Sequence, residues 1–347
     1  MDKLVLLTKT TVESLTKPRS GETKFGEHCK VLTSTNGIYD NIKSLDVNYV
    51  ILGIPEDIGV YANLGNTGAS KAYEATIKVL LNIQSNPFTH ADKVLVLGHL
   101  DFSEELETMT TLNRETPKDL KKIRQLVDQI DKEVSDAVYT IVKAGKTPII
   151  IGGGHNNAYG NIKGTSLALH QSINAINLDA HTDFRALEGR HSGNGFSYAY
   201  AEGFLDKYFM FGLHENYTSQ DIFNTLNSKK ALNYNTFEDL EVRKNLSFTN
   251  ELKRAIDHIY KKPFGIEIDC DAIKNIPSSA QTPSGFSVEK ARQLIHFFGK
   301  HENATYLHIC EAAPKKKQMN AVGKLITYFI TDFIKSNIKN LKQQSYK

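Results

Sequence analysis

At 347 residues and 40% hydrophobic content, the chain can form one large or two small globular domains, and its formal net charge of +3 favours no polyanionic partner. The run Leu4–Leu7 is too short for a signal peptide, and no run approaches the roughly 18 apolar residues of a membrane span. Three scattered cysteines give no disulfide framework, so we expect a cytosolic protein. The balanced charge and the lack of a long apolar run lead us to expect no nucleic-acid or membrane partner.

The amino-terminal half is predicted to begin with an extension. Residues 1–45 are polar and weakly periodic, and we interpret them as packed on a single main domain of residues 46–347. The first convincing core strand is 49–54, and a second is expected at 93–98. Residues 116–145 start with a proline turn, repeat apolar residues at helical spacing and end in glycine. That pattern is typical of a long helix lying on a sheet.

The rest of the chain alternates apolar runs with helical patterns. Further strands are expected at 147–151, 173–178, 208–213, 264–268 and 305–310, and helices near 251–260, 287–300 and 321–338. This alternation predicts an α/β protein of three layers, α/β/α, with a central and mostly parallel sheet.

Polar residues follow three of these strands. One strand ends in His155, one in Asp179, His181 and Asp183, and one in Asp269 and Asp271. In a parallel sheet such strand ends meet at one edge, where buried charges need a cationic counterpart. Four carboxylates and two imidazoles are too many for one tetrahedral zinc. They suit two divalent cations about 3.5–4 Å apart.

Three motifs carry a resemblance to a known family. Gly152-Gly153-Gly154-His155, Asp179-Ala180-His181-Thr182-Asp183 and Asp269-Cys270-Asp271 resemble, in this order, the metal motifs of the ureohydrolase superfamily. That superfamily contains arginase, agmatinase, guanidino-acid hydrolases and formimidoylglutamase. The resemblance implies an arginase-like fold over residues 49–324 and two manganese ions per subunit. His155, Asp179, Asp183 and Asp269 would hold one ion and His181, Asp179, Asp269 and Asp271 the other.

Two loops resemble the formimidoylglutamase branch more than arginase. The first, 59–69, contains Asn63, an expected substrate contact, and has Asn66 where that branch commonly has arginine. In the second, Ser192 stands before Gly193, where arginase and agmatinase have a proton-shuttle histidine. Either His191, one place earlier, reaches the site through a bulge, or the shuttle is absent or replaced.

The resemblance also implies roles for the remaining site residues. Glu311, in an E-x-x-P element, would hold the cationic amidino group, because a carboxylate matches its planar donors. The plainer alternative is a charge at a helix start. Asp183 would orient the attacking water. Arg185 and Arg190 would bind the two carboxylates of a glutamate moiety, with Asn194 as a further contact.

The function expected from this set is hydrolysis of N-formimino-L-glutamate to L-glutamate and formamide, a step of histidine degradation, by a homo-oligomer. The nearer alternative is an agmatinase, arginase or guanidino-acid hydrolase that releases urea. The more distant one is a non-catalytic subunit that binds an amidino ligand. A dinucleotide turn at 152–154 is disfavoured because the third glycine of that motif is absent.

Overall fold

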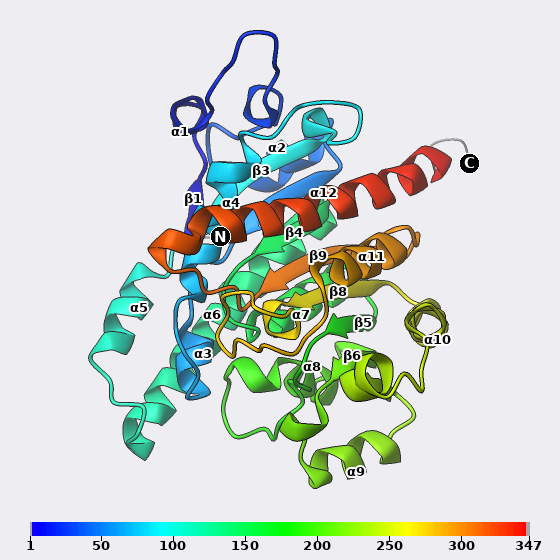
Figure 1. Ribbon diagram of the computed structural model, residues 1–347. Helices are drawn as coiled ribbons and strands as arrows, with labels where there is room; N and C mark the ends of the chain where they lie inside the picture. The colour runs from blue at the N-terminus through cyan, green and yellow to red at the C-terminus, as the bar shows by residue number, and fades with distance from the viewer. Residues whose placement is uncertain (1, 345–347) are drawn as a thin grey trace.

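The computed structural model describes residues 2–344, with side chains to residue 337, and is built on a nine-stranded sheet (Figure 1). The strand order is β1-β3-β2-β4-β9-β8-β5-β6-β7. All neighbouring strands are parallel except the β1–β3 pair. The strands are β1 (Leu4–Leu6), β2 (Tyr49–Gly53), β3 (Val94–Leu100), β4 (Thr147–Ile151), β5 (Ile173–Leu178), β6 (Leu205–Leu213), β7 (Leu232–Thr236), β8 (Phe264–Asp269) and β9 (Ala304–Cys310). The predicted α/β architecture is confirmed.

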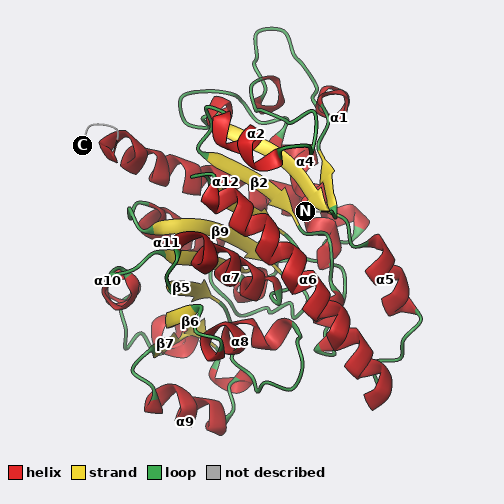
Figure 2. Cartoon of the chain, turned by 180° about the vertical axis from the view of Figure 1, so that it is seen from behind, coloured by secondary structure: helices red, strands yellow, loops and turns green. Residues whose placement is uncertain are grey.

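Helices cover both faces of the sheet (Figures 1 and 2). One face packs against α4 (Ala72–Leu80), α10 (Phe248–Ile259), α11 (Val288–Gly299) and α12 (Met319–Gln344). The other packs against α2 (Ile38–Ser44), α6 (Pro117–Lys143), α7 (Asn157–Leu169) and α8 (Gly195–Ala201). The shorter helices are α1 (Lys9–Leu15), α3 (Ile58–Ala62), α5 (Ser103–Thr110) and α9 (Gln220–Ser228). Among the described residues, no helix combines the length and apolar character needed to cross a membrane.

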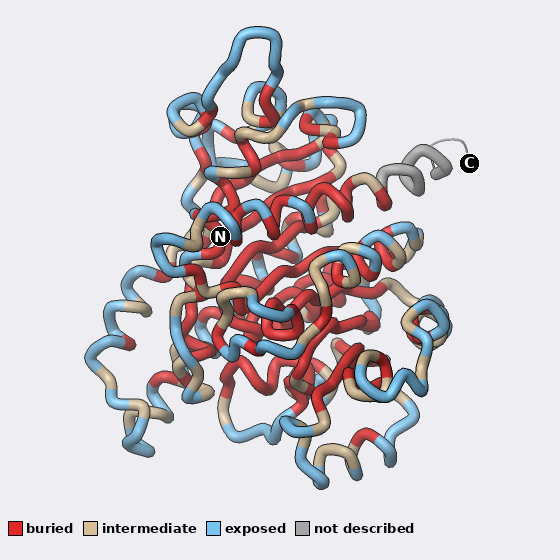
Figure 3. Tube along the Cα trace, viewed as in Figure 1, coloured by how far each residue is buried: buried red, intermediate tan, exposed pale blue. Residues whose placement is uncertain are grey.

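Strand alternation explains the two cores. In β2, Tyr49 and Ile51 belong to the hydrophobic cluster under α4 and α12, whereas Val50 and Leu52 belong to the cluster under α6. All four are fully buried, and Figure 3 shows buried backbone through the central strands of the sheet. A continuous apolar run is therefore what a strand covered on both faces requires.

Helix α7, directly after His155, escaped sequence analysis because it is buried nearly all round and has no amphipathic stripe. It lies against α6 at close range. A Cβ at Gly160 would come within 2.7 Å of the Val134 side chain, and one at Gly164 within 2.5 Å of the Ser135 carbonyl oxygen. The glycines thus let α6 approach the segment that carries the site.

Residues before 46 take part in the sheet. Strand β1 pairs antiparallel with β3 at the sheet edge, and Lys30 forms an isolated bridge with Leu95. A three-residue strand has too little pattern to be found from sequence. The division of the chain at residue 45 into an extension and a single main domain stays a prediction.

Candidate metal and substrate site

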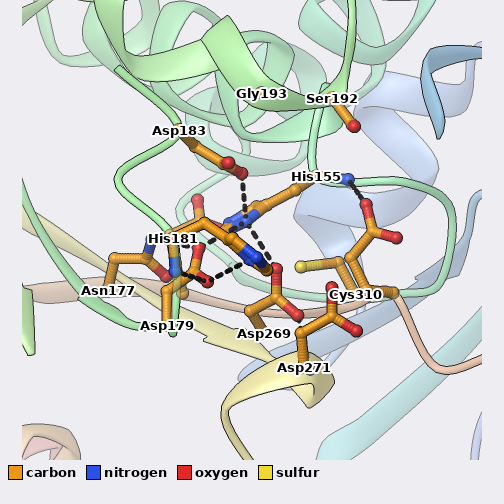
Figure 4. A network of polar contacts seen from close by, with 12 residues as sticks. His155, Asn177, Asp179, His181, Asp183, Ser192, Gly193, Asp269, Asp271 and Cys310 are labelled. Atoms are coloured by element: carbon orange, nitrogen blue, oxygen red, sulfur yellow. Dashed lines mark hydrogen bonds and ion pairs between the residues drawn. The ribbon is translucent and has the colours of Figure 1, made fainter. Parts of the chain in front are cut away.

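The polar residues predicted at strand ends lie at the carboxyl ends of four neighbouring strands. Strands β4, β9, β8 and β5 are consecutive in the sheet. His155 follows β4, Glu311 follows β9, and Asp179 follows β5. Asp269 is the last residue of β8, and Asp271 comes two residues later. Side chains from segments more than 100 residues apart therefore converge (Figure 4).

Four residues have ligand atoms within 4.8 Å of one another and form what we call the His155 cluster: His155, Asp179, Asp183 and Asp269. His155 Nδ1 lies 2.8 Å from Asp183 Oδ2, 3.1 Å from Asp269 Oδ2 and 3.2 Å from Asp179 Oδ2. All four residues are buried, and Nδ1 makes no hydrogen bond of acceptable geometry.

These spacings fit a divalent cation. One imidazole proton cannot serve three carboxylates, so the cluster lacks a positive partner. Neighbouring ligands in an octahedron with bonds of about 2.1 Å lie roughly 3 Å apart, which matches the observed separations. A donor set rich in carboxylates with one imidazole suits hard or borderline ions such as manganese.

The second half of the predicted metal site is looser. His181 Nδ1 lies 3.5 Å from Asp179 Oδ1, and its side chain is one-third exposed. Asp271 is turned toward the neighbouring loop, where it accepts hydrogen bonds from Ser279 Oγ at 3.0 Å and Ala280 N at 2.9 Å. Both residues line the same pocket as Asp183 and Asp269 of the His155 cluster.

Hydrogen bonds from neighbouring groups hold the carboxylates of the His155 cluster in place. Asp179 Oδ2 accepts a hydrogen bond from Asn177 Nδ2 at 2.9 Å, and Oδ1 accepts one from the His181 backbone at 2.8 Å. Asp269 Oδ1 accepts one from the Asp271 backbone at 2.7 Å. Asn177, one alternation before Asp179 on β5, is a site residue that sequence analysis missed.

The electrostatics show the same lack of positive charge. Burial, together with the charges of Asp179 and Asp271, raises the pKa of Asp269 well above its usual range. Burial opposes a charged His181, yet the hydrogen bond and charge of Asp179 raise its pKa to about 10. A metal-free cluster therefore holds extra protons, which a cation would replace.

A cavity of about 380 Å³ opens above these residues. Its walls come from loops after β2, β5, β6, β8 and β9, and include Asn63, Arg185, Ser192, Gly193, Tyr217, Thr218, Ser279 and Glu311. Arg185 is the one lysine or arginine in that lining. Tyr217, whose ring centroid is 5.7 Å from that of His181, had no recognisable signal in the sequence.

Two of the predicted catalytic carboxylates sit on unusual backbone. Asp183 has φ +44° and Glu311 has φ +61°, a left-handed conformation that strains residues with a side chain. Glu311 Oε1 accepts a hydrogen bond from the His155 backbone at 2.6 Å, while Oε2 has no partner. Burial and the charge of Asp271 raise the pKa of Glu311 to about 8.

At the rim, Asn63 and Arg185 are joined. Arg185 Nη1 donates to Asn63 Oδ1 at 2.6 Å, and Asn63 Nδ2 donates to Ser192 Oγ at 3.2 Å. Arg185 Nη2 also contacts Glu188 Oε1 at 3.2 Å. The structure thus brings both predicted substrate residues to the pocket.

Three predicted residues are not brought there, which corrects their expected roles. Arg190 is 2% exposed and points away from the pocket to Asp131 on α6. Asn194 Oδ1 accepts a hydrogen bond from the Arg190 guanidinium, and Asn194 Nδ2 donates to the backbone carbonyls of Ala186 and Gly189. Both side chains therefore hold the loop in place and do not face a substrate.

His191 makes no bulge toward the pocket. Its Nδ1 accepts the Gly193 backbone N–H at 3.1 Å, and its Nε2 lies 3.2 Å from Glu188 Oε1. Burial and the nearby Arg185 lower its pKa to about 3, so it is neutral. Ser192 lines the pocket instead.

Comparison with known proteins places the chain in a family and agrees with its fold. The model of the Arginase family matches residues 47–334. Formimidoylglutamases of Streptococcus pyogenes are 24% identical over 294 residues, which cover 82% of this chain and 83% of the relative. Among solved structures, Trypanosoma cruzi formiminoglutamase with manganese is similar at TM-score 0.69 and 19% identity, covering 90% of this chain and 98% of that one. Formimidoylglutamase from Bacillus subtilis is similar at TM-score 0.68 and 16% identity, with 92% and 93% covered.

Proposed function

The chain belongs to the arginase family, and from that premise we propose that it hydrolyses the C–N bond of a linear amidine, with N-formimino-L-glutamate as the first candidate substrate. The products would be L-glutamate and formamide. The observation that carries the proposal is the His155 cluster itself. A buried imidazole nitrogen faces three carboxylates without a hydrogen bond, and two of these carboxylates, Asp183 and Asp269, line a pocket that also holds Glu311.

We propose manganese as the metal, two ions per chain. His155, Asp179, Asp183 and Asp269 would hold one, and His181, Asp179, Asp269 and Asp271 the other. When bound, such a pair lowers the pKa of water so that hydroxide is available near neutral pH.

The protein side chains would bind and orient the substrate. Glu311 accepts hydrogen bonds from the amidino nitrogens through its unpaired Oε2. The negative charge of Asp271 contributes to the raised pKa of Glu311. A cation bound at Asp271 would offset that charge and favour the ionised carboxylate of Glu311. Arg185 at the rim binds a carboxylate of the substrate with its free N–H groups.

Proton transfer would fall to Asp183. It lies at the pocket base beside His155, and it can accept a proton from the attacking water and return it to the leaving nitrogen. His191 is excluded from this role by its orientation. With Asp183 in this role, no further residue has to replace the proton-shuttle histidine that arginase and agmatinase have at the position of Ser192.

One observation favours a second candidate, a guanidino acid with a single carboxylate that is cleaved to urea. With Arg190 turned away, Arg185 is the one lysine or arginine that lines the pocket, whereas formiminoglutamate carries two carboxylates. A non-catalytic amidino-binding subunit would instead bind metal and ligand without turnover.

The test is a panel of amidines assayed with added manganese, measuring formamide and glutamate against urea. We expect formamide and glutamate from formiminoglutamate, and loss of most turnover in Asp183→Asn. Urea from a guanidino acid alone would transfer the assignment to the second candidate. No turnover of any member by manganese-loaded protein would reject both. A cytoplasmic location, a homo-oligomer and a role in histidine degradation stay predictions.

A further inference from the structure

Arg190 is the most completely bonded cation near the pocket. Its Nε donates to Asp131 Oδ2 at 2.7 Å, and Nη2 donates to Asp131 Oδ1 at 3.2 Å. Nη2 also donates to Asn156 O at 2.9 Å, and Nη1 to His191 O at 3.2 Å and to Asn194 Oδ1. All five N–H groups of the guanidinium are therefore used inside the protein.

Aromatic rings complete this enclosure. The guanidinium carbon lies 5.0 Å from the ring centroids of both Tyr159 on α7 and Tyr198 on α8. Such cation–π contacts gain strength when they are shielded from water. Asp131 is itself only 3% exposed, so neither partner is free to serve a ligand.

The acceptors of Arg190 come from separate parts of the site. Asp131 lies on α6, Asn156 directly follows the metal ligand His155, and Asn194 ends the turn that presents Ser192 and Gly193 to the pocket. One side chain thus ties the metal segment and the pocket wall to the same helix.

The same loop carries Arg185. The Arg185 backbone N–H donates to Gly193 O at 3.1 Å, and Ser197 Oγ donates to Arg185 O at 2.6 Å and to Asn194 O at 3.0 Å. A shift of the turn at 191–194 therefore moves Arg185 with it. The loop between β5 and α8 contains no strand, and its one helical segment is the three-residue turn Ser192–Asn194.

We infer that Arg190 and Asp131 form a positioning pair, which fixes residues 185–194 against α6 and so sets the affinity for the carboxylate end of the substrate. The inference rests on the proposed function for its kinetic part only. Arginine is required because its guanidinium binds the Asp131 carboxylate with two N–H groups and still has donors for the other acceptors. Lysine would supply three donors and no fork.

The chain provides a control for loss of a bidentate arginine–aspartate pair outside the pocket, one in which the Arg292 side chain is 35% exposed. Arg292 Nε donates to Asp332 Oδ2 at 2.6 Å and Nη2 donates to Asp332 Oδ1 at 3.2 Å, the same bidentate geometry. This pair joins α11 to α12, and neither residue lines the pocket.

The experiment compares Arg190→Lys with Arg292→Lys in manganese-loaded protein, using amide hydrogen exchange and steady-state kinetics. For Arg190→Lys we expect faster exchange confined to residues 185–194 and their contacts. We also expect KM to rise about tenfold, as for one lost charge-assisted hydrogen bond, with kcat changed far less. Arg292→Lys should leave KM and exchange in the loop unchanged.

A second variant separates positioning from stability. Replacing both partners, as Arg190→Met with Asp131→Leu, removes the buried charges together, and such replacements often keep a protein folded. The pair model still predicts a raised KM and faster loop exchange in this variant. Wild-type values of both would overturn the inference. If the wild-type protein hydrolyses no amidine, the proposed function fails, whereas the exchange comparison still tests the pair.

Discussion

Replacing Arg185 with alanine should weaken binding of carboxylate-bearing substrates selectively. Two of its five N–H groups are engaged, by Asn63 and Glu188, so three are free for a substrate carboxylate. A charge-assisted hydrogen bond contributes about 1.5–3 kcal/mol, or roughly ten- to a hundredfold in kcat/KM. The side chain is 53% exposed, and competition from water places the effect near the lower end, at about tenfold.

The assay measures KM and kcat for formiminoglutamate and for agmatine, which has no carboxylate. We expect KM for formiminoglutamate to rise in Arg185→Ala, with poor rescue by Arg185→Lys because lysine lacks the fork. Arg292→Ala is the control, because Arg292 joins α11 to α12 and does not line the pocket. An equal loss on both substrates would refute the carboxylate contact.

The other predictions concern the metal site and its neighbours. Asp179→Ala should lose both manganese ions in metal analysis, because its two oxygens face different halves of the site, whereas Asp271→Ala should weaken chiefly one. His191→Ala should reduce kcat only modestly, and a collapse of kcat would reinstate a histidine shuttle. Glu311→Gln should raise KM for every amidine, since it keeps the shape but loses the charge. In metal-free protein, Asp269 has a raised pKa and binds more protons folded than unfolded. The contribution of Asp269 to the free energy of unfolding should therefore fall as pH rises above about 4, and the Asp269→Asn variant should lose this contribution in thermal denaturation of metal-free protein.

The convergence of the candidate metal ligands was predictable because its signals are local. Each candidate ligand follows an apolar run that ends abruptly in polar residues, and parallel strands bring such ends to one edge. Seven of the nine strands and most long helices were found for the same reason, whereas β1 and β7 were not. Helix α7 was not, since Gly160 and Gly164 pack against α6 and leave no polar face to read.

The loop at 185–194 was not predictable in the same way. Arg190 and His191 have the composition of substrate or proton-transfer groups, and no periodic pattern reports where a loop side chain points. The orientation of Arg190 depends on Asp131, about 60 residues earlier on α6, which accepts hydrogen bonds from the guanidinium in the interior, and that of His191 on contacts with Glu188 and Gly193. Neither the spacing nor the motif records that long-range contact.

The central claim is that this pocket adds water to an amidine carbon, and ¹⁸O-labelled water tests it most directly. Manganese-loaded protein would be incubated with N-formimino-L-glutamate in ¹⁸O-water, and the products analysed by mass spectrometry. The account predicts equal amounts of formamide and glutamate, with the label in formamide and none in glutamate. Loaded protein that forms no labelled formamide would contradict it.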